Sequence, residues 1–166
     1  MASTVFPAAS AGKTRKVTTL TSGTSWTVPA GVDYVNAKLI GGGGGGSGQD
    51  NTAAAQNGVA GDSGNIVETT VTTTPGASIT YAIGAGGTGA PANNSTNGGT
   101  GGTTTFTGAT SAVGGSGGHA YRNNGINSVT NLGANNGGQT ATGTAGYTAT
   151  TGANGGSGMI ILEYWV

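Results

Sequence analysis

The sequence contains no cysteine and very few charged residues. The absence of cysteine excludes disulfides and thiolate metal ligands. Charged residues make up 6% of the 166 residues and the formal net charge is zero, with only five Lys and Arg in total. A nucleic-acid-binding surface needs a cluster of cations to neutralise phosphates, so we expect no nucleic-acid partner.

Long apolar runs and helical patterns are missing as well. No stretch approaches the roughly 18 apolar residues of a membrane span, and the N-terminus lacks the apolar run of a secretory signal. No window places apolar residues at i, i+3, i+4 and i+7, and helix-forming residues are scarce. We therefore expect neither membrane insertion nor helices.

Glycine is what the sequence has in excess, with 37 residues arranged in blocks. Glycine loses more backbone freedom on folding than any other residue, so its repeated use indicates either disorder or a need for close backbone approach. Disordered chains are usually rich in charge, which this one is not. No period of three persists beyond a few residues, so a collagen triple helix is excluded. The main blocks lie at 41–46, 84–89, 98–102, 114–118, 137–138 and 155–156.

Between these blocks lie short segments that are rich in β-branched and aromatic residues. Such segments predict strands, and Pro29-Ala30-Gly31 and Pro75-Gly76 predict turns. The last segment has apolar residues on both faces, which favours a central, covered strand. We expect an all-β protein with strands at 17–20, 25–28, 34–40, 65–74, 77–83, 103–107 and 159–166.

Three segments carry a family resemblance. The first is Ser25-Trp26-Thr27-Val28-Pro29-Ala30-Gly31-Val32, followed by a strand that runs into polyglycine. The second is Gly64-Asn65 before a strand, then Thr74-Pro75-Gly76-Ala77-Ser78-Ile79 and Ile83-Gly84-Ala85-Gly86-Gly87. The third is a glycine-rich lead into Gly158 to Val166. This order resembles the glycine-rich domain at the ends of bacteriophage tail fibres and other virion appendages, over residues 17–166. The first two segments are also similar to the glycine-rich region of anaplastic lymphoma kinase-type receptors.

The receptor resemblance implies a jelly-roll-like β-sandwich with polyglycine-II-type helical segments packed between strands. Such extended helices have no internal hydrogen bonds, so their backbone groups must bond to neighbouring helices, which only a missing Cβ permits. We expect residues 17–166 to form this domain. Residues 1–16 are expected to be a flexible arm that attaches to a virion, with Phe6, Lys13, Arg15 and Lys16 as its attachment residues; a frayed terminus is the alternative.

Three motifs could indicate chemistry, and we interpret each as structural. Gly61-Asp62-Ser63-Gly64 is similar to a protease nucleophile motif, but the only histidine, His119, follows the serine among glycines. The segment 7–14 ends like a phosphate-binding loop but begins with Pro7 and has no preceding strand. Asp50 and Asp62 with loop carbonyls would allow a calcium site; otherwise all carboxylates are surface groups. We expect no catalytic residue, no cofactor and no metal.

Two tyrosines lie outside the predicted strands, in loops rich in glycine, asparagine and threonine. Tyrosine supplies rigid amphipathic contact area and asparagine supplies adaptable hydrogen bonds, a combination typical of binding surfaces. We expect Tyr121, Arg122, Asn123, Asn124 and Tyr147 to contact a receptor; the alternative is that the two tyrosines seal the glycine segments.

Together these observations predict a bacteriophage protein at the virion surface, a tail fibre tip or spike, that acts as a structural component and an adhesin. Its expected partners are other virion proteins, a host cell-surface glycan or protein, and two further copies in a homotrimer, because the small apolar fraction favours shared burial. Two alternatives remain. One is a capsid decoration or head-fibre protein that stabilises the virion, and the other is a lectin-like binding module outside any virus.

Overall fold

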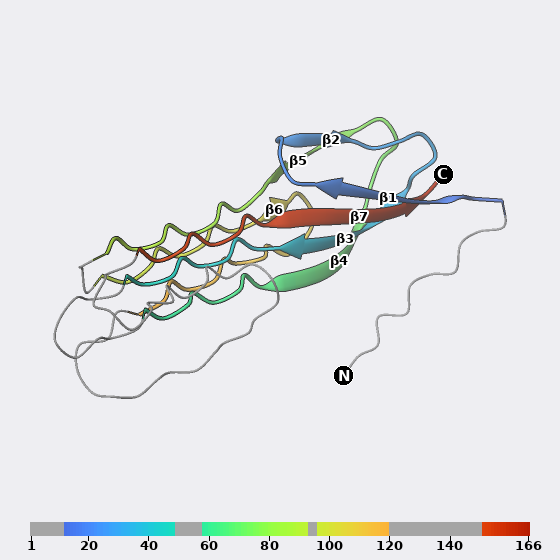
Figure 1. Cartoon of the computed structure of the whole chain (residues 1–166). Helices are drawn as coiled ribbons and strands as arrows, with labels where there is room; N and C mark the ends of the chain where they lie inside the picture. The colour runs from blue at the N-terminus through green and yellow to red at the C-terminus, as the bar shows by residue number, and fades with distance from the viewer. Residues whose placement is uncertain (1–11, 49–57, 93–95, 120–150) are drawn as a thin grey trace.

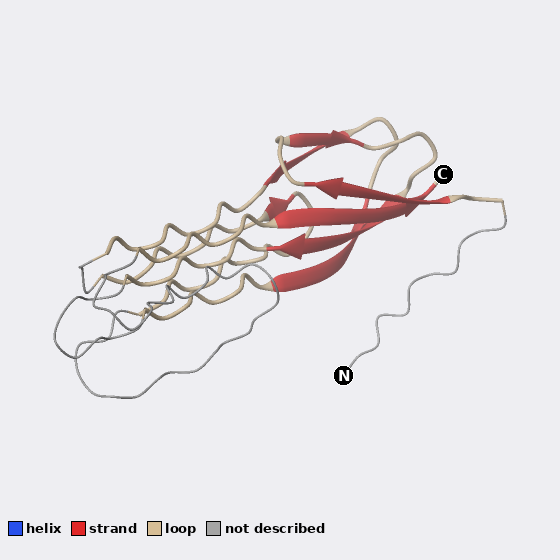
Figure 2. Ribbon diagram, viewed as in Figure 1, coloured by secondary structure: helices blue, strands red, loops and turns tan. Residues whose placement is uncertain are grey.

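The computed structural model describes residues 12–48, 58–92, 96–119 and 151–166 (Figure 1). Within these ranges the chain forms seven strands and no helix, which confirms the all-β prediction (Figure 2). It follows that no described segment is a helix that could cross a membrane. The strands are β1 (Arg15–Leu20), β2 (Ser25–Thr27), β3 (Tyr34–Ile40), β4 (Ile66–Thr72), β5 (Ser78–Ala82), β6 (Thr105–Phe106) and β7 (Met159–Trp165).

The strands pair into two antiparallel sheets. The larger sheet has the order β1-β7-β3-β4 and the smaller one the order β2-β5-β6. β7 lies between β1 and β3, so the prediction that the last strand is central is confirmed. The jelly-roll connectivity implied by the resemblance stays a prediction.

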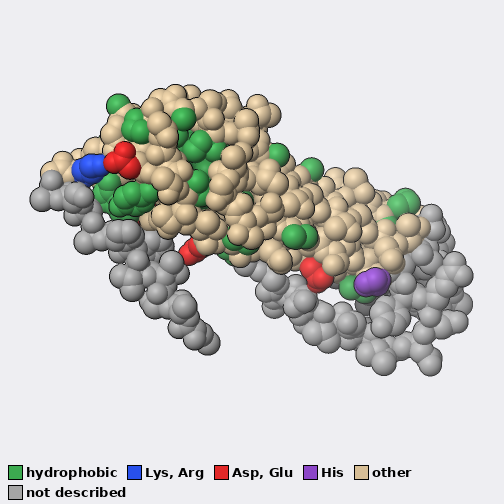
Figure 3. Space-filling model, turned by 180° about the vertical axis from the view of Figure 1, so that it is seen from behind, with side chains coloured by type: hydrophobic (Ala, Val, Ile, Leu, Met, Phe, Trp, Pro, Cys, Tyr) green, Lys and Arg blue, Asp and Glu red, His purple; other side chains and the backbone are tan. Residues whose placement is uncertain are grey.

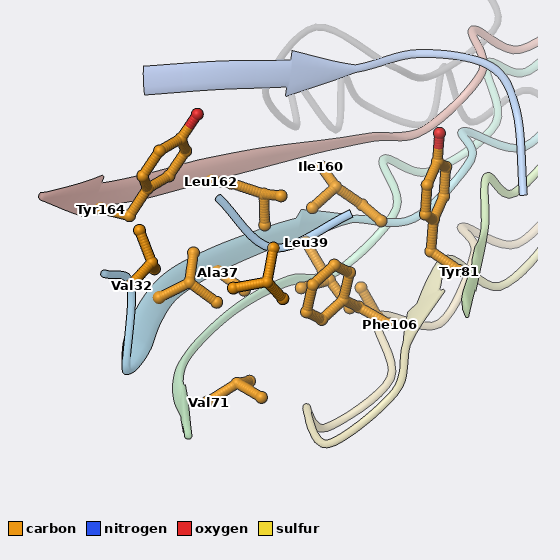
Figure 4. Close-up of a cluster of buried hydrophobic side chains, with 12 residues drawn as sticks. Val32, Ala37, Leu39, Val71, Tyr81, Phe106, Ile160, Leu162 and Tyr164 are labelled. Carbon is orange, nitrogen blue, oxygen red and sulfur yellow. The ribbon is translucent and has the colours of Figure 1, made fainter. Parts of the chain in front are cut away.

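The hydrophobic core lies between the two sheets (Figure 4). Leu39 of β3 and Ile160 and Leu162 of β7 are completely buried, and Phe106 reaches them from the smaller sheet. Trp26 of β2 packs against this core with its ring centroid 6.3 Å from that of Phe106 and 5.5 Å from that of Tyr164. These aromatic contacts join the two sheets and supply much of the burial in a chain poor in large apolar residues.

Both turns predicted from the sequence are present. Gly76 has φ +80° and the Ala77 amide donates to the Thr74 carbonyl over 3.0 Å, so Pro75 and Gly76 occupy the central positions of a type II turn. The turn at 29–32 has the same form, with a φ of +75° at Gly31. Only glycine adopts a positive φ at this position without strain, which explains both residues.

β1 begins at Arg15, two residues earlier than the start expected from the sequence. Arg15 and Lys16, which the sequence placed in the N-terminal arm, therefore form the first positions of a strand that pairs with β7. The boundary between arm and domain at residue 16 stays a prediction, since residues 1–11 lie outside the described part of the chain.

Candidate functional site: the glycine bundle and its far end

Six extended segments continue the strands beyond one end of the sandwich and lie side by side (Figure 1). We call them the glycine bundle. The segment 41–47 continues β3, and the segment 84–90 follows β5 after one residue. The others are 58–65 before β4, 98–102 before β6, 152–158 before β7, and 113–118 after the residue that bridges to Thr104.

The segment 41–47 is the centre of the bundle, and all of its residues are buried. Its amides donate in turn to three neighbours with a period of three residues, over N–O distances of 2.8 to 2.9 Å. Gly41, Gly44 and Ser47 donate to 58–65, Gly42 and Gly45 to 98–102, and Gly43 and Gly46 to 152–156.

Two further segments donate to the central one. Gly115 and Gly118 donate to the carbonyls of Gly42 and Gly45, and Gly87 and Ala90 donate to those of Gly43 and Gly46. The outer segments also bond to one another in the order 58–65, 113–118, 98–102, 84–90, 152–158. The buried backbone groups are thus paired between segments instead of within a helix or a sheet, as buried amides and carbonyls require.

At its buried glycines, the spacing of these segments leaves no room for a Cβ. A Cβ added at Gly44 would lie within 3.0 Å of three backbone atoms of Ser116 and Gly117, and Gly58, Gly61 and Gly64 would each meet a carbonyl of the central segment inside the same limit. The sequence signal for this arrangement is Gly-x-x-Gly-x-x-Gly, present at 58–64. The segment 84–90 has the same period of three among its buried positions, with Ala90 in place of the third glycine. Sequence reasoning missed it because each run is only three repeats long.

Two buried hydroxyls mark the ends of the central segment. At the sandwich end, Thr104 Oγ1 donates to the Ile40 carbonyl over 2.7 Å and accepts from the Gly84 amide over 3.0 Å. At the far end, Ser47 Oγ accepts from the Val59 amide over 2.7 Å. Neither side chain has exposed surface. Each hydroxyl therefore supplies a hydrogen bond to backbone groups that no water can reach.

The far end of the bundle is the level of Ser47, Val59, Ala90, Gly98, Gly118 and Ala153. Just beyond this level the chain enters three connections, which include residues 49–57, 93–95 and 120–150. The expected receptor residues Tyr121, Arg122, Asn123, Asn124 and Tyr147 belong to the third connection and lie outside the described residues, as does Asp50. The structure does show that the residues beside both ends of this connection lie at the far end of the bundle, because Gly118 and Gly152 donate to the carbonyls of Gly45 and Ala90.

The expected attachment residues lie at the opposite end of the molecule, apart from Phe6, which is outside the described residues. Lys13 Nζ donates to the Gly31 carbonyl over 2.9 Å, and Arg15 forms an exposed ion pair with Glu163. The hydrogen bond and the charge of Glu163 raise the pKa of Arg15. Thr14 and Val166 exchange backbone hydrogen bonds beside them. In the view from behind, one cationic and one anionic side chain lie side by side near one end, and the remaining charged side chains are separated by uncharged surface (Figure 3).

The residues considered for catalysis and metal binding do not form a site in the part of the chain that is described. Ser63 Oγ is buried and has no hydrogen-bond partner there, so no base is positioned to activate it. The described residues contain no group of three His, Asp or Glu side chains close enough to hold a metal ion. The expectations of no catalytic residue and no metal stay predictions.

The features above define a class of β protein in which two small sheets carry a side-chain-poor bundle held by backbone hydrogen bonds. The sequence matches the family described as "Glycine-rich domain" over residues 18–159, and the chain belongs to this family. No curated protein matches the chain.

Proposed function

We propose that this chain is a non-enzymatic binding protein of a bacteriophage virion, in which the glycine bundle carries a receptor-binding surface away from the point of attachment. The observation that supports it best is that the two ends of the molecule carry different features. The three connections leave from the far end of the bundle, whereas Thr14 and Val166 lie together at the other end of the sandwich (Figure 1). A hydrogen-bonded body with three connections gathered at one end suits presentation of a binding surface.

We further propose that the bundle segments are polyglycine-II-type helices. The central segment donates to three different neighbours in a period of three, which is the number of residues per turn of such a helix. None of the glycines of the central segment has a positive φ. This agrees with the left-handed polyglycine-II form, whose φ is about −75°.

Amide hydrogen exchange tests this helical form. Slow exchange at Gly42 to Gly46 is expected, because these amides are buried and bonded between segments. Exchange as fast as in an unstructured peptide would contradict both the bundle and the presentation role that depends on it.

Binding of the labelled protein to intact bacterial cells and to a glycan array tests the adhesive function. The test variant replaces all five expected receptor residues, Tyr121, Arg122, Asn123, Asn124 and Tyr147, by alanine. A matched control carries alanine at three exposed sandwich positions, Ser25, Thr27 and Thr72. We expect the control to bind like the wild type and the test variant to lose binding. Wild-type protein that bound neither cells nor glycans would refute the adhesive role.

Capsid decoration is the second candidate function, and the basic cluster favours it. Lys13, Arg15 and Lys16 hold three of the five basic residues in four positions at the end opposite the connections, where another virion protein could dock. Deleting residues 2–11 leaves β1 intact and separates the two roles. An adhesin without these residues should fail to join the particle but still bind cells when purified, whereas a decoration protein should leave particles that are less resistant to heat.

A further inference from the structure

The ring of segments around the centre of the glycine bundle is open on one side. Five segments surround 41–47, and each bonds to the next around it, but the first and the last of the described ring, 58–65 and 152–158, share no backbone hydrogen bond. A helix with three residues per turn directs the three amides and three carbonyls of each turn toward six neighbours. The described part of the chain therefore supplies five of the six neighbours that the central segment could bond.

One carbonyl of the central segment points into this opening. The other carbonyls of 42–46 accept in turn from 113–118 and from 84–90, but that of Gly44 accepts from no described residue. A Cβ added to Gly61 or to Gly155, on the two sides of the opening, would lie within 3.0 Å of this oxygen. Gly44 is buried, and buried carbonyls are usually paired, so the opening should receive an amide from a further segment.

Amides on the two walls of the opening lack acceptors as well. The segment 98–102, which has a neighbour on each side, donates to both of them, whereas 58–65 and 152–158 each donate to a ring neighbour on one side only. The wall amides with no acceptor among the described residues include those of Gly61, Gly64, Ala153 and Gly156. The opening thus has donors on its walls and an acceptor at its base, which are the groups that one more extended segment would bond.

The segment 113–118 shows which sequence such a position requires. It lies between two antiparallel segments, runs in the same direction as 41–47 and donates to it. A Cβ at any of its four glycines would lie within 3.0 Å of a carbonyl oxygen of a flanking segment, whereas Ser116 between them is exposed. A segment in the equivalent position between 58–65 and 152–158 therefore needs the pattern Gly-Gly-x-Gly-Gly.

This chain has no further segment with that pattern. Gly-Gly-x-Gly-Gly occurs at 41–46, 98–102 and 114–118, and all three already belong to the bundle. Neither the N-terminal residues nor the three connections contain it. A second copy would have to open its own bundle to supply one. The occupant should therefore come from a different polypeptide.

We propose that the opening between 58–65 and 152–158 is a binding site for an extended Gly-Gly-x-Gly-Gly segment of another protein, which runs alongside 41–47 as the sixth member of the ring. Its amides donate to the Gly44 carbonyl, and its carbonyls accept from the wall amides. The site recognises the main chain and the absence of Cβ atoms, as strand addition to a sheet edge does, so the side chain at x can vary. The inference goes beyond the adhesive role and does not depend on it.

Titration of the full chain with a synthetic peptide tests the site. The probe is Gly-Gly-Ser-Gly-Gly-Ser-Gly-Gly, which extends the sequence of 114–118, and the control peptide has alanine in place of the second glycine of each pair. The readout is the NMR amide signals of the wall residues, Gly61, Gly64, Ala153 and Gly156. We expect the probe to shift them saturably in the millimolar range, because a free glycine peptide loses much backbone freedom on binding. The control peptide should bind at least about tenfold more weakly.

A pair of protein variants locates the binding. Ala153→Leu enlarges an exposed side chain on one wall and should abolish the shifts. Ser116→Leu enlarges an exposed side chain on a segment away from the opening and should leave them unchanged. Slow amide exchange at Gly42 and Gly45 in both variants checks that the bundle is intact. Equal binding of the probe by the two variants would overturn the proposed location.

Amide exchange of the chain alone separates the other possible occupants. The wall amides should exchange much faster than those of Gly42 and Gly45, and the probe should slow them. Wall amides that are slow without peptide would show that the chain's own residues fill the opening, and wall amides that are slow only at high protein concentration would show that a second copy does. Either result would overturn the proposal, as would a probe that shifts no wall signal at tens of millimolar.

Discussion

A methyl group added to the centre of the glycine bundle should destabilise the protein strongly. Gly44→Ala is the most informative change, because Gly44 lies midway along the central segment and is buried against the backbone of a neighbouring segment. Its new Cβ would fall within 3.0 Å of the Ser116 carbonyl and the Gly117 amide. These are backbone atoms, so rotating a side chain cannot relieve the clash and the segment 113–118 must move away.

The magnitude follows from the hydrogen bonds that this movement breaks. The segment 113–118 donates to the central segment from Gly115 and Gly118. A broken bond that leaves buried groups unpaired costs about 1–3 kcal/mol, so two of them cost about 2–6 kcal/mol. Alanine gains back about 0.5–1 kcal/mol by restricting the unfolded chain. We expect a net loss of about 1–5.5 kcal/mol, a large part of the 5–15 kcal/mol that stabilises a typical domain.

Urea denaturation followed by tryptophan fluorescence measures this loss, and amide exchange locates it. The matched control is Ser116→Ala, which changes an exposed side chain at the same contact and leaves its carbonyl in place. The control should lie within about 0.5 kcal/mol of the wild type. If Gly44→Ala were as stable as Ser116→Ala, the close backbone contact at this position would not exist.

Three further substitutions test other parts of the structure. Thr104→Val removes a buried hydroxyl that bonds two backbone groups, so it should cost about 2–4 kcal/mol in urea denaturation, whereas the exposed neighbour Thr103→Val should cost little. Trp26→Ala removes the ring that joins the two sheets and should cost about 3–5 kcal/mol and abolish most of the near-ultraviolet circular dichroism. Ser63→Ala removes a buried hydroxyl without a described partner, so stability should stay unchanged or rise by up to about 1 kcal/mol; a loss above that would show that the hydroxyl is bonded.

The strands and turns could be predicted from the sequence because their signals are local. Six of the seven observed strands lie inside the expected ranges, and only β1 starts earlier, at Arg15. Pro75 and Gly76 fix their turn through their own backbone preferences. The pairing of β7 with β1 and β3 could not be predicted, because alternation identifies which face of a strand is buried but not which strand lies beside it.

The geometry of the bundle was only partly predictable. The need for close backbone approach follows from the glycine blocks, but the order of segments around 41–47 depends on contacts between residues distant in sequence. The inner positions are also not all glycine, since Ser47 and Ala90 are buried among them, which hides the period of three. For the candidate site, the sequence indicated residues of the third connection. The structure shows that this connection starts and ends at the far end of the bundle.

The bundle separates the residues that stabilise it from those that form its surface. Along 84–90, the buried positions are Gly84, Gly87 and Ala90, and the exposed ones are Ala85 and Thr88. The buried positions accept almost no side chain, whereas the exposed ones contribute only backbone groups to the hydrogen bonds, so their side chains can change freely. Each glycine costs roughly 0.5–1 kcal/mol relative to alanine, and the paired backbone groups of the bundle offset that cost without large apolar residues. A scaffold held by its main chain can thus keep its shape while the surface and the far-end connections change, which is the property that the proposed binding role requires.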